Sequence, residues 1–175
     1  MKQLFFAQNL MKQCFSVYAL LLFLPSTYCL GQGTWTQIGD MPVLRNHYVS
    51  VGYNGKIYIF GGTADFTSCT NEVYEFDPVT GVYTPKAIMP AVMCGMTAAE
   101  YDGKIYLFGG SPVFIGVASN LAFEYDVANN SWSTITVMPT ARIYPAASVL
   151  NDKIYVTGGG TSYGTFTTNV VNVYD

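Results

Sequence analysis

The sequence predicts an all-β protein made of repeated four-stranded antiparallel sheets, and three observations support this fold class. A short apolar stretch closed by two glycines occurs three times, beginning at Lys56, Lys104 and Lys153, so the repeats are 48 and 49 residues apart. Strand-like segments surround each copy. The segments between the copies show no helical periodicity. Repeats of this length predict equivalent β-units that pack together, because one such unit alone cannot bury its apolar faces.

Each repeat is expected to start with a β-hairpin. Its first strand combines apolar and small residues, and the three copies cover His47 to Tyr53, Met96 to Tyr101 and Ala146 to Leu150. The turns that follow use residues that tolerate positive φ, namely Asn54-Gly55, Asp102-Gly103 and Asn151-Asp152. In the second strand, residues 57–60 are all apolar or aromatic and alternate between the two faces, so both faces of the sheet must be covered.

The second half of each repeat supplies two more strands. A pair of glycines ends the second strand and is expected to let the backbone bend or approach another segment closely, at Gly61-Gly62, Gly109-Gly110 and Gly158-Gly159. The third strands alternate and cover residues 73–77, 122–126 and 171–175. An aromatic residue then marks the fourth strand at Tyr83 and Trp132, and the same kind of residue appears at Trp35. Four antiparallel strands per repeat make one blade of a β-propeller.

A link that begins with Met-Pro connects the repeats, and the residue three positions beyond the proline is Arg45, Met93 or Arg142. The glycine pair, the aromatic-Asp third strand, the later tryptophan and the Met-Pro-x-x-Arg link resemble kelch repeats over about residues 34–175. The resemblance implies a kelch-type β-propeller, similar to the central domain of galactose oxidase. Tyr83 in place of Trp, Met93 in place of Arg and Thr157 in place of an apolar residue depart from the pattern.

The propeller is expected to cover residues 32–175, with blades at about 43–88 and 91–137 and an incomplete blade at 140–175. A strand from Trp35 to Ile38 is expected to complete another blade. Together these strands amount to about three blades, whereas propellers close with about four to eight. We therefore expect a piece of a ring of about five to seven blades, whose remaining blades belong to the same full-length protein. The alternative is that two copies combine their blades into a ring of six.

Residues 1–31 are predicted to be a secretory signal peptide, with Met11 as an alternative start. Two lysines and no acidic residue precede the apolar run at 14–24, which is shorter than the roughly 20 residues that a spanning helix needs. A core helix over this run, or a lipoprotein signal at Cys29, are the other interpretations. We expect a secreted, periplasmic or cell-surface protein with no membrane span after removal of the signal.

Charge and cysteine content limit the function classes further. Without Lys2 and Lys12, the chain carries six basic and eleven acidic residues, and this balance argues against a nucleic-acid partner. Cys69 and Cys94 lie beyond the predicted signal peptide. We expect two buried thiols there, with a single disulfide as the alternative, because export would permit one.

A binding site is expected where the loops between second and third strands meet the links. The aromatic residues of these loops lie among Thr, Ser and Gly, and they are Phe66, Phe114, Tyr163 and Phe166. Aromatic rings beside hydroxyls suit a sugar or a protein surface, with packing of the loops onto the blade edge as the alternative. Arg45, His47 and Arg142 begin the innermost strands. Two arginines facing the axial channel would bind a carboxylate, whereas the alternative is that each ties its link to a carbonyl or an aspartate of the neighbouring blade.

These features favour a non-catalytic secreted propeller that binds a protein or a glycan through its long loops and links. The sequence shows no nucleophile elbow, phosphate-binding loop or metal cluster, so no catalytic residue, cofactor or metal is expected. The resemblance also implies two enzymes as alternatives. Periplasmic sialic acid mutarotases are similar propellers, in which an arginine and a carboxylate such as Glu100 would act on a sugar acid. A copper site like that of galactose oxidase needs two histidines, and because His47 is alone its other ligands would have to lie in further blades.

Overall fold

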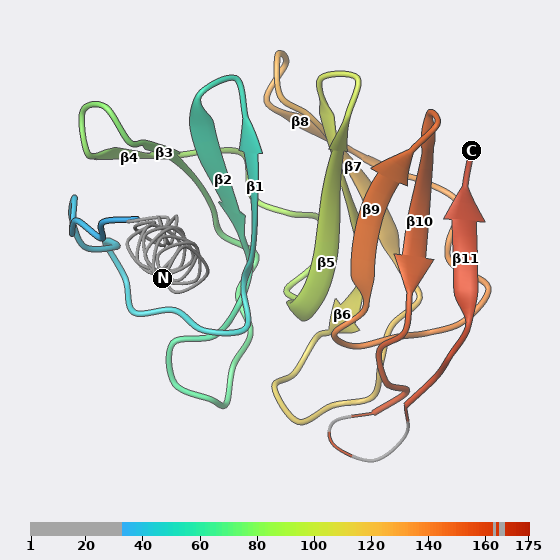
Figure 1. The fold of residues 1–175 in the computed structure, drawn as a ribbon. Coiled ribbons are helices and arrows are strands. Elements are labelled where there is room, and N and C mark those ends of the chain that lie inside the picture. Colours follow the sequence, from blue (N-terminus) through green and yellow to red (C-terminus); the bar gives the residue numbers. More distant parts are fainter. Residues whose placement is uncertain (1–32, 163, 165–166) are drawn as a thin grey trace, which may run out of the picture. The chain divides into compact units, whose positions relative to one another are not determined.

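The structure, a computed structural model, describes residues 33–162, 164 and 167–175. The chain divides into two units, Met1–Gln37 and Ile38–Asp175, and the described strands belong to the second (Figure 1). They form three antiparallel sheets, and no helix occurs among the described residues. The first sheet has the order β1 (Val49–Tyr53), β2 (Lys56–Phe60), β3 (Val73–Asp77) and β4 (Val82–Pro85). The second has the order β5 (Cys94–Tyr101), β6 (Lys104–Ser111), β7 (Ala122–Asp126) and β8 (Ser131–Thr134), and the third β9 (Ala146–Leu150), β10 (Lys153–Thr157) and β11 (Val171–Tyr174), with β10 in the middle.

Two-residue turns join the first and second strands of every sheet, as the sequence predicts. Asn54 and Gly55 have φ angles of 49° and 73°, and the corresponding residues of the other two turns also lie in the left-handed region. This conformation at both turn positions matches the twist of the flanking strands, which explains the choice of Asn, Asp and Gly. The inner strands start at slightly different residues from those expected, with β1 beginning at Val49 and β5 at Cys94.

The strand expected from Trp35 to Ile38 is not formed, because residues 33–40 have no regular structure. A fourth strand needs the outer edge of a third strand to pair with. The edges of β3 and β7 are taken by β4 and β8, and residues 33–40 do not pair with β11. Trp35 is fully exposed, at 102% of its reference area. The described residues therefore contain eleven strands instead of the twelve that the sequence suggests.

The second strands lie at the centre of the core. In the middle sheet Ile105 and Leu107 are 0% exposed and Tyr106 is 9% exposed, so both faces of β6 are covered as the alternating pattern requires. One apolar cluster, around Phe60 and Leu107, joins the first and second sheets. A second cluster, around Phe108 and Val156, joins the second and third sheets. The sheets thus pack face to face, as blades do.

The inner strands of the three sheets are neighbours along the chain and in space, in the order β1, β5, β9 (Figure 1). Backbone hydrogen bonds join the segments that lead into them. Gly95 N donates to His47 O at 2.8 Å, and Tyr144 N donates to Gly95 O at 2.7 Å. One residue per repeat therefore forms a continuous hydrogen-bonded row across the three sheets.

The glycine pairs meet the link that leads into the next repeat. Gly62 N donates to Met93 O at 3.0 Å, and Gly110 N donates to Arg142 O at 2.7 Å. A Cβ atom at Gly109 would lie 2.4 Å from the same Arg142 oxygen, and the φ of Gly109 is +72°. Both the close approach and the left-handed backbone require glycine at this position.

Three antiparallel sheets of equivalent register, with adjacent inner strands and apolar interfaces between sheets, confirm the predicted all-β, propeller-type fold. Within the part of the chain that the structure describes, no helix has the length and apolar character needed to cross a bilayer.

Candidate binding site

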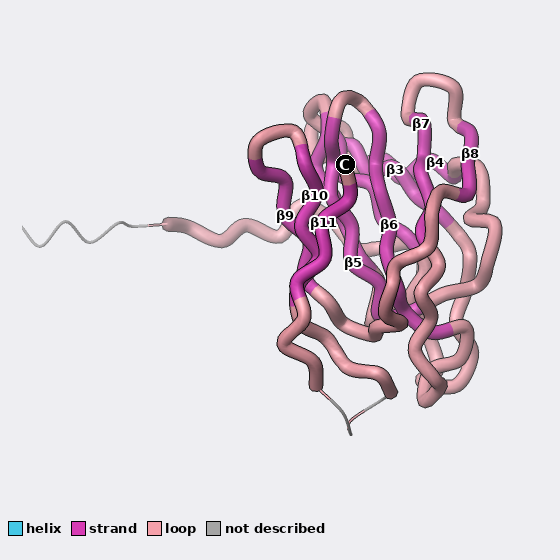
Figure 2. Tube along the Cα trace, turned by 90° about the vertical axis from the view of Figure 1, so that its right-hand side faces the viewer, coloured by secondary structure: helices cyan, strands magenta, loops and turns pink. Residues whose placement is uncertain are grey.

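The long loops gather on one side of the sheets, opposite the two-residue turns. The connections β2–β3 and β6–β7 and the described parts of the β10–β11 connection run along the lower edge in Figure 1 and Figure 2, whereas the β1–β2, β5–β6 and β9–β10 turns point the other way. We call the loops 63–70 and 111–119, with the link residues 43–48, 92–95 and 142–145, the loop face. Isolated backbone bridges fasten these loops to one another, for example Ser68 to Val113.

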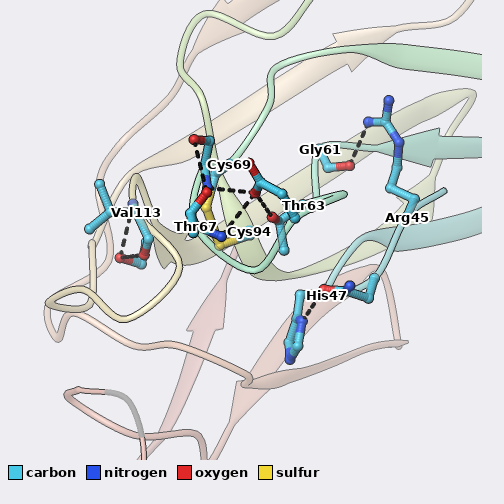
Figure 3. The surroundings of a disulfide bond; sticks show 12 residues. Arg45, His47, Gly61, Thr63, Thr67, Cys69, Cys94 and Val113 are labelled. Atoms are coloured by element: carbon cyan, nitrogen blue, oxygen red, sulfur yellow. Dashed lines mark hydrogen bonds between the residues drawn. A yellow bond between two sulfur atoms is a disulfide. The ribbon is translucent and has the colours of Figure 1, made fainter. Parts of the chain in front are cut away.

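A disulfide fixes the first of these loops to the next sheet (Figure 3). The structure bonds Cys69, in the β2–β3 loop, to Cys94 at the start of β5, with their Cα atoms 5.5 Å apart. The structure thus shows the disulfide alternative instead of the free thiols that we expected. The physical reason is the repeat geometry: Thr70 and Met93 form a backbone bridge, which brings the preceding and following cysteines face to face.

The loop itself is shaped by Asp65. Its carboxylate accepts hydrogen bonds from Thr67 N and Ser68 N, both at 2.9 Å, and from the Thr63 hydroxyl at 3.1 Å. These bonds, led by that from Ser68 N, lower the pKa of Asp65 well below its ordinary value. The turn around the charged Asp65 fixes the backbone beside Phe66, whose side chain is 56% exposed.

Four rings from separate segments meet on the loop face. His47 lies at their centre, with ring centroids 4.9 Å from Phe114, 5.4 Å from Tyr144 and 6.2 Å from Phe66. Phe66 and Phe114 are 5.4 Å apart with nearly perpendicular ring planes. Such edge-to-face geometry is favourable between aromatic rings. We call these four residues the aromatic cluster.

The aromatic cluster stands on strained backbone. Among the described residues, the non-glycine residues with positive φ fall into two groups, and five of them occupy hairpin turns: Asn54, Asp102, Asn130, Asn151 and Asp152. The other three are His47, Phe66 and Tyr144, with φ angles of 54°, 58° and 55°. Bulky residues adopt this conformation at a cost of about 1–2 kcal/mol each, and such strain concentrates at functional sites.

The cluster combines a buried base with exposed tips. Phe114 is 6% exposed and supports the others, whereas Phe66 is 56% and Tyr144 is 41% exposed. The His47 Nδ1 atom lies 2.6 Å from Asn46 Oδ1, which orients the imidazole ring. Further apolar side chains lie exposed on the same loop face: Val43, Leu44, Val92, Val113, Ile115 and Val117. The loop face therefore presents both aromatic and aliphatic surface to solvent.

Both candidate arginines are engaged within their own sheets. Arg45 donates to Gly61 O at 2.8 Å and forms an ion pair with Glu72, and its side chain is 3% exposed. Arg142 is fully buried and donates to the carbonyls of Val156 and Val170 and to Asn172 Oδ1. Burial lowers the pKa of Arg142. Of the two interpretations, this geometry favours the structural one, although the partners belong to the same blade and not to the neighbouring blade.

The middle link replaces the arginine with an apolar arrangement. Met93 is 1% exposed and lies in the same apolar cluster as Phe60 and Met96, with Leu121 packed against that cluster. Leu121 occupies the position that corresponds to Glu72 in the first repeat. The apolar Met93 thus replaces the arginine at the place where an apolar Leu121 replaces the glutamate that pairs with it.

The other predicted residues are not brought together with the arginines. Glu100 lies at the turn end of β5, where it accepts a hydrogen bond from Gly103 N at 3.0 Å, whereas Arg142 precedes β9, at the end of its sheet away from the β9–β10 turn. Tyr163 and Phe166 fall outside the described residues. Within the described residues, no three His, Cys, Asp or Glu side chains gather as they would around a metal ion.

Tyr144 is the site residue that the sequence reasoning missed. It stands two positions after Arg142, as His47 stands two positions after Arg45, so the repeat register contained the signal. A hollow of about 410 Å³ opens beside Tyr144 and is lined by Ile143, Gly159, Gly160 and Thr167. The site thus extends from the aromatic cluster toward the third sheet.

Repeated four-stranded antiparallel sheets that bury both faces against their neighbours, with short turns at one end and long loops at the other, define a β-propeller scaffold. The chain belongs to the kelch-repeat family, because the model of the KLHDC2/KLHL20/DRC7 Kelch-repeats domain matches residues 22–175. A similar curated protein is N-acetylneuraminate epimerase of Pasteurella multocida (strain Pm70), which is 36% identical over 55 residues. The aligned part is 29% of this chain and 14% of the length of that relative.

Proposed function

We propose that this chain is a non-catalytic binding propeller that takes a protein partner on its loop face. The observation that carries the proposal is the aromatic cluster, in which three of four rings stand on left-handed backbone and two have exposed tips. Folding alone gives no reason to place His, Phe and Tyr at such positions, where glycine would be free of strain.

The surroundings of the cluster favour a protein over a glycan. Exposed aromatic rings flanked by exposed aliphatic side chains are typical of the centre of protein interfaces, where charged residues are depleted. Asp65 is the charged residue of loops 63–70 and 111–119 and is engaged with its own loop. The disulfide and the backbone bridges hold the loops in place before binding, which lowers the entropic cost of association. We further propose that the protein acts after export, as its amino-terminal sequence predicts.

The test first identifies partner proteins by crosslinking them to the chain at the surface of the cell that produces it, and then purifies them. The affinity of each purified partner for wild type is then compared with its affinity for variants of the chain. Phe66→Ala and Tyr144→Ala are expected to weaken binding at least about tenfold in calorimetry, since central aromatic residues contribute more than 1 kcal/mol each. Val79→Ala is the matched control, because Val79 is 89% exposed on the opposite, turn-bearing side. Equal affinities for all three variants would refute the proposal, and selective binding to a glycan array would replace the protein with a sugar.

The second candidate is an epimerase that acts on N-acetylneuraminate, and the local identity with the Pasteurella multocida enzyme supports it. The burial of Arg142 and the distance of Glu100 along its strand from the loop face speak against it. Interconversion of the anomers of N-acetylneuraminate can be followed by NMR with and without the chain. Acceleration over the buffer rate that persists in Phe66→Ala would support an enzyme and oppose a loop-face binding role.

A further inference from the structure

The inference starts from the turn between β7 and β8 in the middle sheet. This turn leads through Asn129 and Asn130 into Ser131, and among the ten asparagines of the sequence Asn129 is the one followed two positions later by Ser or Thr. Asn-x-Ser, with any residue except proline at x, is the acceptor pattern for N-linked glycosylation of exported proteins. The pattern also occurs by chance, so the surroundings of Asn129 decide what it means.

Asn129 lies in an accessible turn on the far side from the loop face. The turn covers residues 127–130, between the end of β7 at Asp126 and the start of β8 at Ser131. Asn129 and Ser131 are both exposed. Figure 2 shows the β7–β8 turn at the end of the sheets opposite the long loops. An enzyme can therefore reach the Asn129 amide, and a glycan attached there would leave the loop face uncovered.

The two neighbouring asparagines are engaged in different ways. Asn130 has a φ of 49°, and its Oδ1 accepts hydrogen bonds from Ala87 N at 2.9 Å and from the Tyr125 hydroxyl at 2.7 Å. It thus ties the turn to the preceding link. The backbone N and the Nδ2 of Asn129 instead donate to the two carboxylate oxygens of Asp126, at 2.9 and 2.8 Å, within the same turn. Because an amide Nδ2 carries two hydrogens, a sugar can replace one while the other keeps the bond to Asp126.

The fold does not require this pair of residues. The corresponding turn of the first sheet has Thr80 at the position of Asn129 and Val82 at the position of Ser131. There Thr80 N donates to Asp77 Oδ1 at 3.4 Å, so the same backbone bond forms without an asparagine side chain. Val82 is 55% exposed, so this position does not need a hydroxyl for packing. A role in folding therefore does not explain why the middle repeat carries Asn and Ser at these two positions.

We propose that Asn129 is a site of N-linked glycosylation, with a lipid-linked oligosaccharide diphosphate as the sugar donor. Nδ2 forms a bond to C1 of the first sugar, the bond from C1 to the diphosphate oxygen breaks, the lipid diphosphate leaves with the electron pair, and Nδ2 loses one proton. The inference rests on the export proposed above, because this modification is made on exported chains. A bulky, hydrophilic glycan would shield the turn-bearing side and leave the loop face as the side open to a partner.

The experiment produces the full chain in cultured animal cells and measures its mass, in the medium and in the cells, before and after treatment with peptide-N-glycosidase. Wild type in the medium is expected to lose the mass of one glycan and to leave aspartate in place of Asn129. Asn129→Gln and Ser131→Ala should carry no glycan, whereas Ser131→Thr should keep it, because threonine also completes the acceptor pattern. Asn54→Gln is the control, since Asn54 is an exposed turn asparagine outside the pattern, and it should keep the glycan.

Measuring both fractions separates a failure of this proposal from a failure of export. Wild type that reaches the medium and does not change mass on treatment would overturn the glycosylation and leave export standing. Wild type that stays in the cells without a glycan would contradict export, and the same chain behind an added secretory leader then tests the acceptor by itself. A glycan at Asn129 in that chain would support the site, and its absence would overturn it. A glycan that persists in Asn129→Gln would also overturn the assignment, because the sugar would then be attached elsewhere.

Discussion

Removal of the Cys69–Cys94 disulfide tests how much the loop face depends on covalent fixation. The bridge closes a loop with a sequence separation of 25 residues. In the chain-entropy description, a closed loop of that length restricts the unfolded chain by about 3.5 kcal/mol at 25 °C. This is a large share of a total unfolding free energy of about 5–15 kcal/mol. The double variant Cys69→Ala/Cys94→Ala is therefore expected to lose about 3 kcal/mol, or roughly 10 °C in melting temperature.

The assay is urea unfolding followed by fluorescence, with and without a reducing agent. Reduction should lower the stability of wild type to about that of the double variant and should leave the double variant unchanged. Reduction of wild type breaks the bond but keeps both side chains, so it separates the effect of the bond from that of the cavity that Cys94→Ala leaves. A wild type whose stability does not change on reduction would refute the reasoning and show that the two sulfurs are not joined in solution.

Three further predictions concern single residues of the sheets. Gly109→Ala should destabilise the protein by about 1–3 kcal/mol more than Gly158→Ala. Both glycines have positive φ, but the nearest atom to an added Cβ is 2.4 Å away at Gly109 and 3.8 Å away at Gly158. Equal losses of stability in urea unfolding would contradict the role of the close approach. Arg142→Met should cost at least about 2 kcal/mol in the same assay, since buried carbonyls lose a charged donor, and an unchanged midpoint would count against that role. The Lys56 ammonium and the nearby backbone N–H groups hold the pKa of Asp77 at about 2, below its usual 3.8. Because this pKa is lowered by folding, the stability that wild type has over Asp77→Asn should be full above about pH 4 and disappear as the pH falls toward 2; a difference that persists at pH 2 would contradict the assignment.

The fold could be predicted because its determinants are local and repeated. The turn residues, the glycine pairs and the alternation of residues 57–60 each have one physical explanation, and three copies in register confirm one another. Trp35 shows the limit of this reasoning. Its segment carries the sequence of a fourth strand, but residues 33–40 pair with no third strand in the structure, and the sequence pattern of one segment does not determine which edge it pairs with.

The candidate site could be predicted only in part. Phe66, Phe114 and His47 were named from the sequence, and the structure brings their rings together with Tyr144. The left-handed backbone beneath them could not be foreseen, because His, Phe and Tyr have no preference for positive φ. The arginines were ambiguous because a guanidinium suits a carbonyl as well as a ligand carboxylate, and only three-dimensional burial distinguishes the two.

The hydrogen-bonded row that crosses the inner strands has a consequence for how this scaffold can diversify. Its three members are His47, Gly95 and Tyr144, all with positive φ, and the backbone bonds between them involve no side chain. At Gly95 an added Cβ would lie 2.7 Å from the Tyr144 ring, so the missing side chain makes room for its neighbour. In the first and third repeats this position therefore carries a ring whose replacement would alter what the propeller presents while the backbone bonds beneath keep the sheets in register, whereas position 95 must stay glycine as long as Tyr144 keeps its place.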